Sequence, residues 1–114
     1  MRLNIYHTND IHADFSFLSR VRVYLSDHRE KSDLYFDSGD FLDLKSVLVQ
    51  ADRGRSALEL LALCRPEAMA VGNNEIDLGS ADLERLAQLP MLCANICRND
   101  GTPVPGLESH VILE

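Results

Sequence analysis

Hydrophobic and polar positions along the chain show two periodicities, the short alternation of strands and the longer repeat of helices. The changes from one to the other mark the expected strands and helices. Leu3 to His7 is rich in strand formers and breaks into Thr8-Asn9-Asp10, which predicts a strand ending in a polar loop. From about Ser16 to Lys31 the apolar residues recur at helical spacing, namely Leu18, Val21, Tyr24 and Leu25. This stretch is predicted to be an amphipathic helix.

The same succession of strand, polar turn and helix follows in the next part of the chain. Leu34 to Phe36 is a short apolar run that ends in the tight polar turn Asp37-Ser38-Gly39-Asp40. A second helix is expected from about Gly54 to Cys64, where the apolar residues share one face and Pro66 marks the stop. Strand and helix therefore alternate a second time.

The alternation continues once more. A third strand at Ala68 to Val71 ends in Gly72-Asn73-Asn74-Glu75. Ser80 can then cap a third helix, whose apolar face carries Leu83, Leu86 and Ala87. Met91 to Ala94 is predicted to be a fourth strand that ends at Asn95.

The last part of the chain is expected to form a polar loop from Arg98 to Gly106, followed by the start of another strand at His110 to Leu113. Short strands joined by helical crossovers pair in parallel, so the fold class is an α/β sheet with mostly parallel strands. In such sheets ligands gather at the carboxyl ends of the strands. Because no internal repeat or linker divides the sequence, residues 1–114 are expected to form one unit.

The charge balance narrows the class of partner. The chain of 114 residues is 46% hydrophobic and 25% charged, as expected for a globular domain, and has a formal net charge of −7. This charge repels the phosphate backbone, so no nucleic-acid partner is expected. A small phosphorylated substrate such as a nucleotide remains compatible, because bound divalent ions can supply the positive charge.

The sequence also lacks signals for targeting or crosslinking. Its N-terminal residues hold no apolar stretch long enough for a signal peptide or a transmembrane helix, so no membrane contact and a cytoplasmic location are expected. The three cysteines, Cys64, Cys93 and Cys97, do not have the spacing of a zinc module or a disulfide framework.

Side chains able to bind metal follow the ends of the predicted strands. Asp10 and His12 come after the first strand, Asp40 after the second and Asn73 after the third. Parallel strands bring their carboxyl ends to one edge of the sheet, so these four side chains are expected to converge. Asp10 and His12 are two positions apart, which in an extended loop points both side chains the same way. A glycine precedes Asp40 and another precedes Asn73, which allows tight turns or close approach of the backbone.

The types of these side chains indicate both a metal and a reaction. Mixed oxygen and nitrogen ligands suit Mn, Fe or Zn better than Ca or Mg, and a carboxylate such as Asp40 can bridge two ions. Two ions about 3.5 to 4 Å apart clamp a phosphoryl group and lower the pKa of the attacking water. The pattern therefore predicts two divalent metal ions and metal-assisted hydrolysis of an ester.

Each motif alone has a plainer interpretation. An Asp-x-His loop is common outside metal sites. Asp37-Ser38-Gly39-Asp40 can be a solvated turn with Asx capping, and Gly72-Asn73-Asn74-Glu75 can be a left-handed turn. The position of all three directly after predicted strands is what favours the metal site.

Four runs of the sequence are His7-Thr8-Asn9-Asp10-Ile11-His12, Asp37-Ser38-Gly39-Asp40, Gly72-Asn73-Asn74-Glu75-Ile76-Asp77 and Ala94-Asn95-Ile96. Together they resemble the start of the 5'-nucleotidase family of calcineurin-like metallophosphoesterases. The resemblance implies a four-layer α/β/β/α catalytic domain with two metals, acting on nucleotides or related phosphate esters, of which residues 1–114 are the N-terminal portion. It also implies that Asp10 and His12 hold the first metal, that Asp40 bridges, and that Asn73 binds the second metal through its side-chain oxygen.

One position departs from the family's pattern. The family has Gly-Asn-His-Glu where this chain has Gly72-Asn73-Asn74-Glu75. In the family the histidine, paired with an aspartate that matches Asp77, stabilises the transition state or protonates the leaving oxygen. Asn74 cannot donate a proton as an acid, but it can donate a hydrogen bond to a phosphoryl oxygen. Asn74 and Asp77 are therefore the candidate catalytic residues.

The family's remaining ligands, a histidine and a His-x-His pair from the second half of the domain, have no match in these 114 residues. The chain alone is therefore expected to be inactive, to bind metal weakly, and to self-associate through an uncovered sheet face and edge strand. Two other functions stay open. One is a non-catalytic relative that binds nucleotides or a partner, which Asn74 would fit; the other is a plain structural α/β domain, which would bind no metal.

Overall fold

The computed structural model describes residues 2–86 and 89–114, which form one sheet of five parallel strands. The strands follow one another across the sheet in sequence order. They are β1 (Ile5–Thr8), β2 (Leu34–Asp37), β3 (Ala68–Ala70), β4 (Met91–Leu92) and β5 (Leu107–Glu108). Since neighbours are parallel, each connection must cross from the end of one strand to the start of the next.

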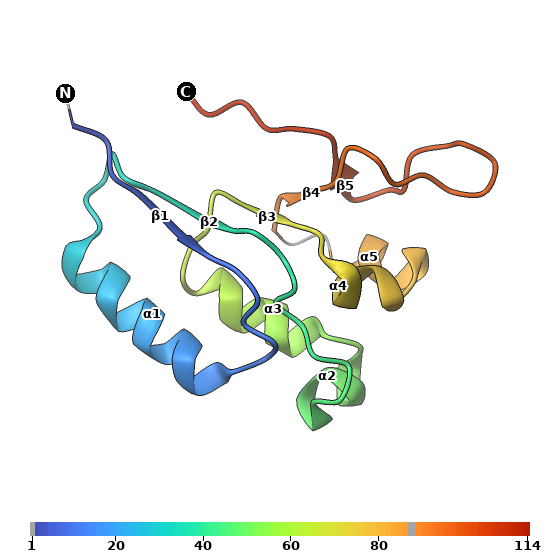
Figure 1. The fold of residues 1–114 in the computed structure, drawn as a ribbon, viewed down its shortest axis with the longest axis horizontal. Coiled ribbons are helices and arrows are strands. Elements are labelled where there is room, and N and C mark those ends of the chain that lie inside the picture. The colour runs from blue at the N-terminus through green and yellow to red at the C-terminus, as the bar shows by residue number, and fades with distance from the viewer. Residues whose placement is uncertain (1, 87–88) are drawn as a thin grey trace.

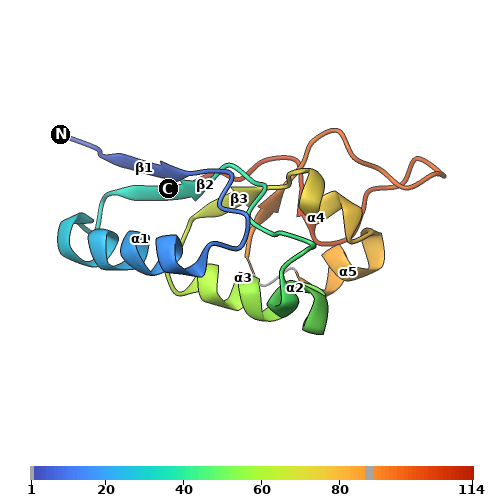
Figure 2. The same cartoon turned by 60° about the horizontal axis from the view of Figure 1, so that its bottom comes forward.

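Helices make the first three of these connections. They are α1 (Phe15–His28) before β2, α2 (Val47–Asp52) and α3 (Arg55–Ala62) before β3, and α4 (Asn73–Asp77) and α5 (Ser80–Arg85) before β4. Figures 1 and 2 show α1 and α3 against one face of the sheet, with α4 and α5 beyond the end of β3. The predicted parallel α/β architecture is confirmed. The chain provides a sheet layer and a helix layer, two of the four layers expected.

The helix-facing side of the sheet holds the apolar core. Tyr35, Met69 and Met91, on the three middle strands, are fully buried there. Leu18 and Leu25 of α1 are buried too, and their spacing of two helical turns places both on one side of the helix. Burying side chains of this size stabilises the fold by about 1.5 to 3 kcal/mol each.

The loop between β1 and α1 is short and fixed at its far end. The Asp14 side chain caps α1 by accepting a hydrogen bond of 2.8 Å from the Phe17 N–H. At the other end of the helix, the Arg29 N–H donates to the Leu25 carbonyl. Residues 9–14 are therefore held between a strand and a capped helix, which limits how far the side chains of this loop can move.

The other face of the sheet carries no helix among the described residues (Figure 2). Alternation along β1 and β2 places Ile5, Leu34 and Phe36 on this face, opposite to Tyr6 and Tyr35. Ile5 is 60% exposed, and Leu34 and Phe36 are only partly buried. The structure thus contains the uncovered apolar face that the sequence predicts for this chain alone.

The C-terminal part differs from the prediction. The strand expected at His110–Leu113 is wrong, because these residues are exposed and unpaired, and the strand forms earlier, at Leu107–Glu108. There the backbone is in register with Met91–Leu92, and pairing with a neighbour decides a strand's position more strongly than apolar content does.

The observed helices also differ in part from those predicted. The hydrophobic pattern does not predict the short helices α2 and α4. Gly79 rather than Ser80 occupies the cap position of α5, and the predicted contribution of Ala87 lies outside the described residues. Within the described part of the chain, no helix has the length and apolar content needed to cross a membrane.

Candidate metal centre

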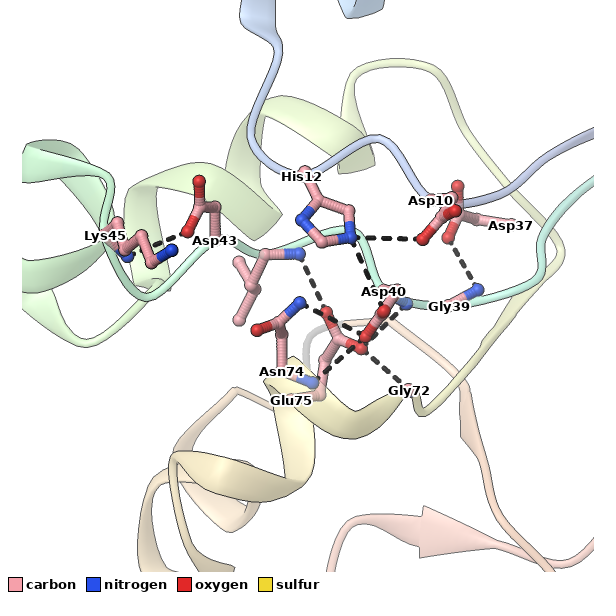
Figure 3. A network of polar contacts seen from close by, with 11 residues as sticks. Asp10, His12, Asp37, Gly39, Asp40, Asp43, Lys45, Gly72, Asn74 and Glu75 are labelled. Atoms are coloured by element: carbon pink, nitrogen blue, oxygen red, sulfur yellow. Dashed lines mark hydrogen bonds and ion pairs between the residues drawn. The ribbon is translucent and has the colours of Figure 1, made fainter.

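The loops that follow β1 and β2 are joined backbone to backbone at the carboxyl edge of the sheet, and Figure 3 shows the side chains that they bring together. The Asp10 N–H donates to the Gly39 carbonyl at 2.9 Å, and the His12 N–H donates to the Asp40 carbonyl at 3.2 Å. The next residues along each loop form a third bond of 2.7 Å. Asp10, His12 and Asp40 therefore begin from neighbouring backbone positions.

The three side chains converge. His12 Nε2 lies 3.1 Å from Asp10 Oδ1 and 3.5 Å from Asp40 Oδ2. One ligand atom from each residue lies within 4.8 Å of the others, so the three atoms could bind a single ion. Two carboxylates and an imidazole fit Mn, Fe or Zn. The Asp10 side chain is 65% exposed and that of Asp40 is 21% exposed, so the cluster is open to solvent on one side.

The loop backbone is left-handed at all three positions, with φ of 60° at Asp10, 50° at His12 and 56° at Asp40. The prediction of an extended Asp10-x-His12 loop is therefore wrong. The hydrogen bonds to the loop after β2 hold the chain in a tight turn, and the side chains meet because of that turn. Left-handed backbone costs a non-glycine residue about 1 to 2 kcal/mol, and such strain concentrates at functional sites.

Two glycines let the loops after β2 and β3 come into contact. Gly39 has a φ of 96°, and a Cβ there would lie 2.9 Å from the Gly72 nitrogen. A Cβ on Gly72 would lie 2.4 Å from the Asp40 nitrogen, closer than non-bonded atoms can approach. The predicted use of glycine for tight turning and close approach is present at both positions.

The plainer interpretation holds in part for the first glycine motif and is wrong for the second. Asp37 is 1% exposed, so Asp37-Ser38-Gly39-Asp40 is not a fully solvated turn, but the Gly39 N–H donates to Asp37 Oδ1, as in an Asx turn. Gly72 has a φ of −91°, and the right-handed helix α4 begins at the next residue, so Gly72-Asn73-Asn74-Glu75 is not a left-handed turn.

The first turn of α4 brings two asparagines to Asp40. One end of the Asn73 amide lies 3.1 and 3.2 Å from the two Asp40 carboxylate oxygens. With nitrogen at that end the amide donates hydrogen bonds to Asp40, and with oxygen there it offers the predicted oxygen ligand beside the carboxylate. Asn74 donates to Asp40 Oδ1 from its backbone N–H at 3.0 Å and from Nδ2 at 3.3 Å. All four predicted ligands and Asn74 therefore share one site.

Asp77 lies apart from this group. It ends α4 and is exposed, and in the described part of the chain its carboxylate forms no hydrogen bond with Asp40 or Asn74. Its role as a partner in catalysis stays a prediction.

No role for Asp37 is predicted from the sequence. Its carboxylate accepts two hydrogen bonds that link the loop after β2 to the end of β1. The Thr8 hydroxyl donates to Asp37 Oδ2 at 2.6 Å, and the Gly39 N–H donates to Oδ1 at 3.0 Å. Thr8 also hydrogen-bonds the Tyr35 hydroxyl at 2.7 Å. Burial raises the pKa of Asp37 and raises the pKa of Tyr35 to about 12. The period-two pattern of β2, which places Asp37 on the buried face of Tyr35, is the signal that could have identified it.

Asp37 is expected to make folding stability fall as the pH rises. Because its pKa is higher in the folded state than the usual value of about 3.9, the folded chain binds this proton more tightly than the unfolded chain. The contribution of Asp37 to the free energy of unfolding should therefore be greatest below about pH 4 and decline as the pH rises through the folded pKa. Urea unfolding of wild type and Asp37→Asn at pH 4 to 7 tests this.

The measured quantity is the stability of wild type minus that of Asp37→Asn, which should decrease as the pH rises. Asp43→Asn is the control, because Asp43 is a partly exposed carboxylate whose hydrogen bond is local, to the Lys45 N–H. The decrease should be larger for Asp37→Asn than for Asp43→Asn, because Asp37 is buried and Asp43 is partly exposed. A flat difference for Asp37→Asn, or equal differences for the two variants, would contradict the expected shift.

Comparison with known proteins places this site in context. The uncharacterized metallophosphoesterase YunD of Bacillus subtilis (strain 168) is 33% identical to the chain over 110 residues, which cover 88% of the chain and 24% of the relative. The snake venom 5'-nucleotidase of Crotalus adamanteus is 29% identical over 134 aligned positions, covering 96% of the chain and 22% of that protein. The chain is a homologue of metallophosphoesterases and 5'-nucleotidases. The predicted resemblance is confirmed.

Solved structures agree on the fold of this homologue. The 5'-nucleotidase precursor from Thermus thermophilus superposes with a TM-score of 0.67 at 23% identity, over 82% of the chain and 22% of that protein. The Haemophilus influenzae NAD nucleotidase superposes with a TM-score of 0.68 at 20% identity, over 87% of the chain and 22% of that protein. No family model matches. The chain spans about a quarter of the length of the curated relatives.

Proposed function

We propose that this chain supplies the N-terminal portion of a metallophosphoesterase catalytic domain that hydrolyses nucleotides or related phosphate esters with two divalent ions. The observation that carries the proposal is the convergence of Asp10, His12 and Asp40 at the carboxyl edge of a parallel sheet. These residues come from two separate loops, and homologues with phosphoesterase and nucleotidase names share this part of the sequence.

The family resemblance suggests how the ions would be held. Asp10 and His12 would bind the first ion, Asp40 would bridge, and Asn73 would bind the second through its side-chain oxygen. Mn, Zn or Fe suits this mixed set better than Mg or Ca. Such ions, when bound, stabilise negative charge on a phosphoryl group and lower the pKa of an attacking water.

The chain's own residues would position the phosphoryl group. Asn74 Nδ2 lies beside Asp40 and can donate a hydrogen bond to a phosphoryl oxygen, but it has no proton to give as an acid. Asp77 is the second candidate catalytic residue. The net charge of −7 supports a small substrate rather than nucleic acid, and we place the protein in the cytoplasm, away from the membrane.

The test of the proposed function is phosphate release by the natural protein that contains this chain. It should hydrolyse nucleoside monophosphates with Mn²⁺, and His12→Ala should lower kcat/KM by at least about tenfold, because loss of even an indirect metal partner costs about 10- to 100-fold. His28→Ala is the matched control, since His28 stacks on Tyr24 in α1. Absence of turnover, or equal rates for wild type and His12→Ala, would rule out the hydrolase.

A non-catalytic nucleotide-binding module is the second candidate, and one observation favours it. The position of the family's acid histidine is occupied by Asn74. Such a module would show nucleotide binding that depends on Mn²⁺ and is lost in His12→Ala, without phosphate release. Calorimetric titration with a nucleoside monophosphate beside the hydrolysis assay separates the two candidates.

The 114-residue chain studied alone is expected to self-associate, because no described helix covers one face of the sheet and β1 lies at its edge. Light scattering should give at least twice the monomer mass of 12.8 kDa. Ile5→Lys places a charge on that face and edge and should restore the monomer. Val23→Lys, at a similarly exposed position on α1, should leave the association intact. A wild-type monomer, or equal effects of the two lysines, would contradict this expectation.

A further inference from the structure

A second buried carboxylate, Glu75, links the loops that carry the metal-ligand candidates. It lies in the first turn of α4 and is fully buried. Its Oε2 accepts hydrogen bonds from the Asp40 N–H at 3.0 Å and the Gly72 N–H at 2.8 Å, and its Oε1 accepts one from the Leu42 N–H at 2.8 Å (Figure 3). One side chain thus ties together the loop after β2, the end of β3 and helix α4.

The link joins the two halves of the candidate site, which also approach each other closely at Gly39 and Gly72. Asp10 and His12 are fixed to the loop after β2 by backbone bonds, whereas Asn73 and Asn74 belong to α4. Between these halves lie the contacts of the two asparagines with Asp40, which the site itself uses, and the Glu75 carboxylate. In the described part of the chain, the Glu75 carboxylate forms no hydrogen bond with a candidate ligand side chain, but it holds the backbone from which Asp40 extends.

We propose that Glu75 is a positioning residue, which sets the separation between the Asp10, His12 and Asp40 cluster and the Asn73 ligand by holding the loop after β2 against α4. The proposal rests on the proposed function, because it assigns Glu75 to the same metal site. Glutamine at this position keeps the shape but replaces one acceptor oxygen by an NH₂ group. That group would face a backbone N–H that now donates to Glu75, so the three-way link could not be completed.

The test is Mn²⁺ binding by the natural protein that contains this chain, with Glu75→Gln compared with wild type. Partners that orient metal ligands typically contribute about 10- to 100-fold in affinity, and a loss of that size is expected. Amide NMR gives a second readout. In wild type Mn²⁺ should broaden signals from both halves, and in Glu75→Gln the broadening of Asn73 and Asn74 should weaken relative to that of His12.

Asp33→Asn is the matched control for a merely structural role. Asp33 is also a buried carboxylate that accepts backbone hydrogen bonds, from Asn4 at 3.2 Å and Glu30 at 2.9 Å, but it precedes β2 at the opposite end of the sheet. The Asp33→Asn variant should have a lower melting temperature than wild type and the same Mn²⁺ affinity. If Glu75→Gln does not fold, Glu75→Asp, which keeps the charge on a shorter side chain, takes its place with the same expected loss.

Two outcomes overturn the inference and are distinguishable. Wild-type Mn²⁺ affinity and unchanged broadening in the folded Glu75 variant would leave the proposed function intact and show that Glu75 is structural only. Failure of the wild-type natural protein to bind Mn²⁺ at all would instead contradict the metal site, and with it both proposals.

Discussion

Replacing Asp40 by alanine is expected to weaken Mn²⁺ binding by more than about 100-fold. Residues that only hydrogen-bond to a metal ligand contribute about 10- to 100-fold to affinity, and loss of a direct ligand should cost more. Asp40 is the residue on which both halves of the site converge. Its Oδ2 lies 3.5 Å from His12 Nε2, and its Oδ1 accepts the Asn74 N–H at 3.0 Å. Without this carboxylate Asp10 and His12 are left as one pair, with Asn73 separate from them. Calorimetric titration with Mn²⁺ measures the change.

The control for this prediction is Asp43→Ala, which removes the same charge three residues away. The Asp43 side chain accepts a local hydrogen bond of 2.8 Å from the Lys45 N–H and is not part of the ligand cluster. Its Mn²⁺ affinity should equal that of wild type. Equal losses in the two variants would show that the cation is attracted by the net charge of −7 rather than bound by a site.

Replacing Gly72 by alanine is expected to destabilise the fold and the site together. The φ of −91° suits any residue, so backbone conformation is not the obstacle. The added methyl would lie 2.4 Å from the Asp40 nitrogen and 2.6 Å from its Oδ1, and backbone atoms cannot move aside as a flexible side chain can. Overpacking of this kind costs about 1 to 3 kcal/mol or more. Urea unfolding should show that loss, and Mn²⁺ affinity should fall because Asp40 is displaced.

Gly101→Ala separates this contact from the general effect of adding a methyl group. Gly101 has a φ of +81°, and a methyl group there would meet nothing within 4 Å, so the expected cost is the backbone strain of about 1 to 2 kcal/mol alone. Mn²⁺ affinity should not change in this variant. A stable Gly72→Ala protein with wild-type affinity would mean that the loops after β2 and β3 can separate without loss of the site.

The order of elements could be predicted because burial leaves a period in the sequence. The helical spacing of Leu18 and Leu25 and the short apolar runs at β2 and β3 indicated the alternation, and from it the shared edge of the sheet. Short elements escaped, since α2 and α4 have six and five residues, too few to show a period. The last strand was misplaced because its position depends on register with β4.

For the candidate site, too, the sequence predicts which residues take part but not the backbone conformation that brings them together. Asp10, His12, Asp40 and Asn73 could be named because each follows a strand, which is a statement about order along the chain. Their backbone conformation could not, since the left-handed turns depend on hydrogen bonds between two loops that lie far apart in sequence. Glu75 was missed for a related reason: its partners are backbone N–H groups, which every residue type except proline carries and which leave no signature in a sequence. Asp37 has one such partner, the Gly39 N–H, and its other partner, Thr8, lies 29 positions away.

The bond from the Asn74 backbone N–H to Asp40 has a consequence for how such sites diversify. Because the donor is backbone, any residue except proline at position 74 could keep this contact. The neighbouring loops are likewise held by hydrogen bonds that use main-chain N–H groups, so these contacts do not depend on the side chain at position 74. Exchange of histidine for asparagine there would therefore change the group proposed to face the substrate while the surrounding hydrogen bonds stay intact.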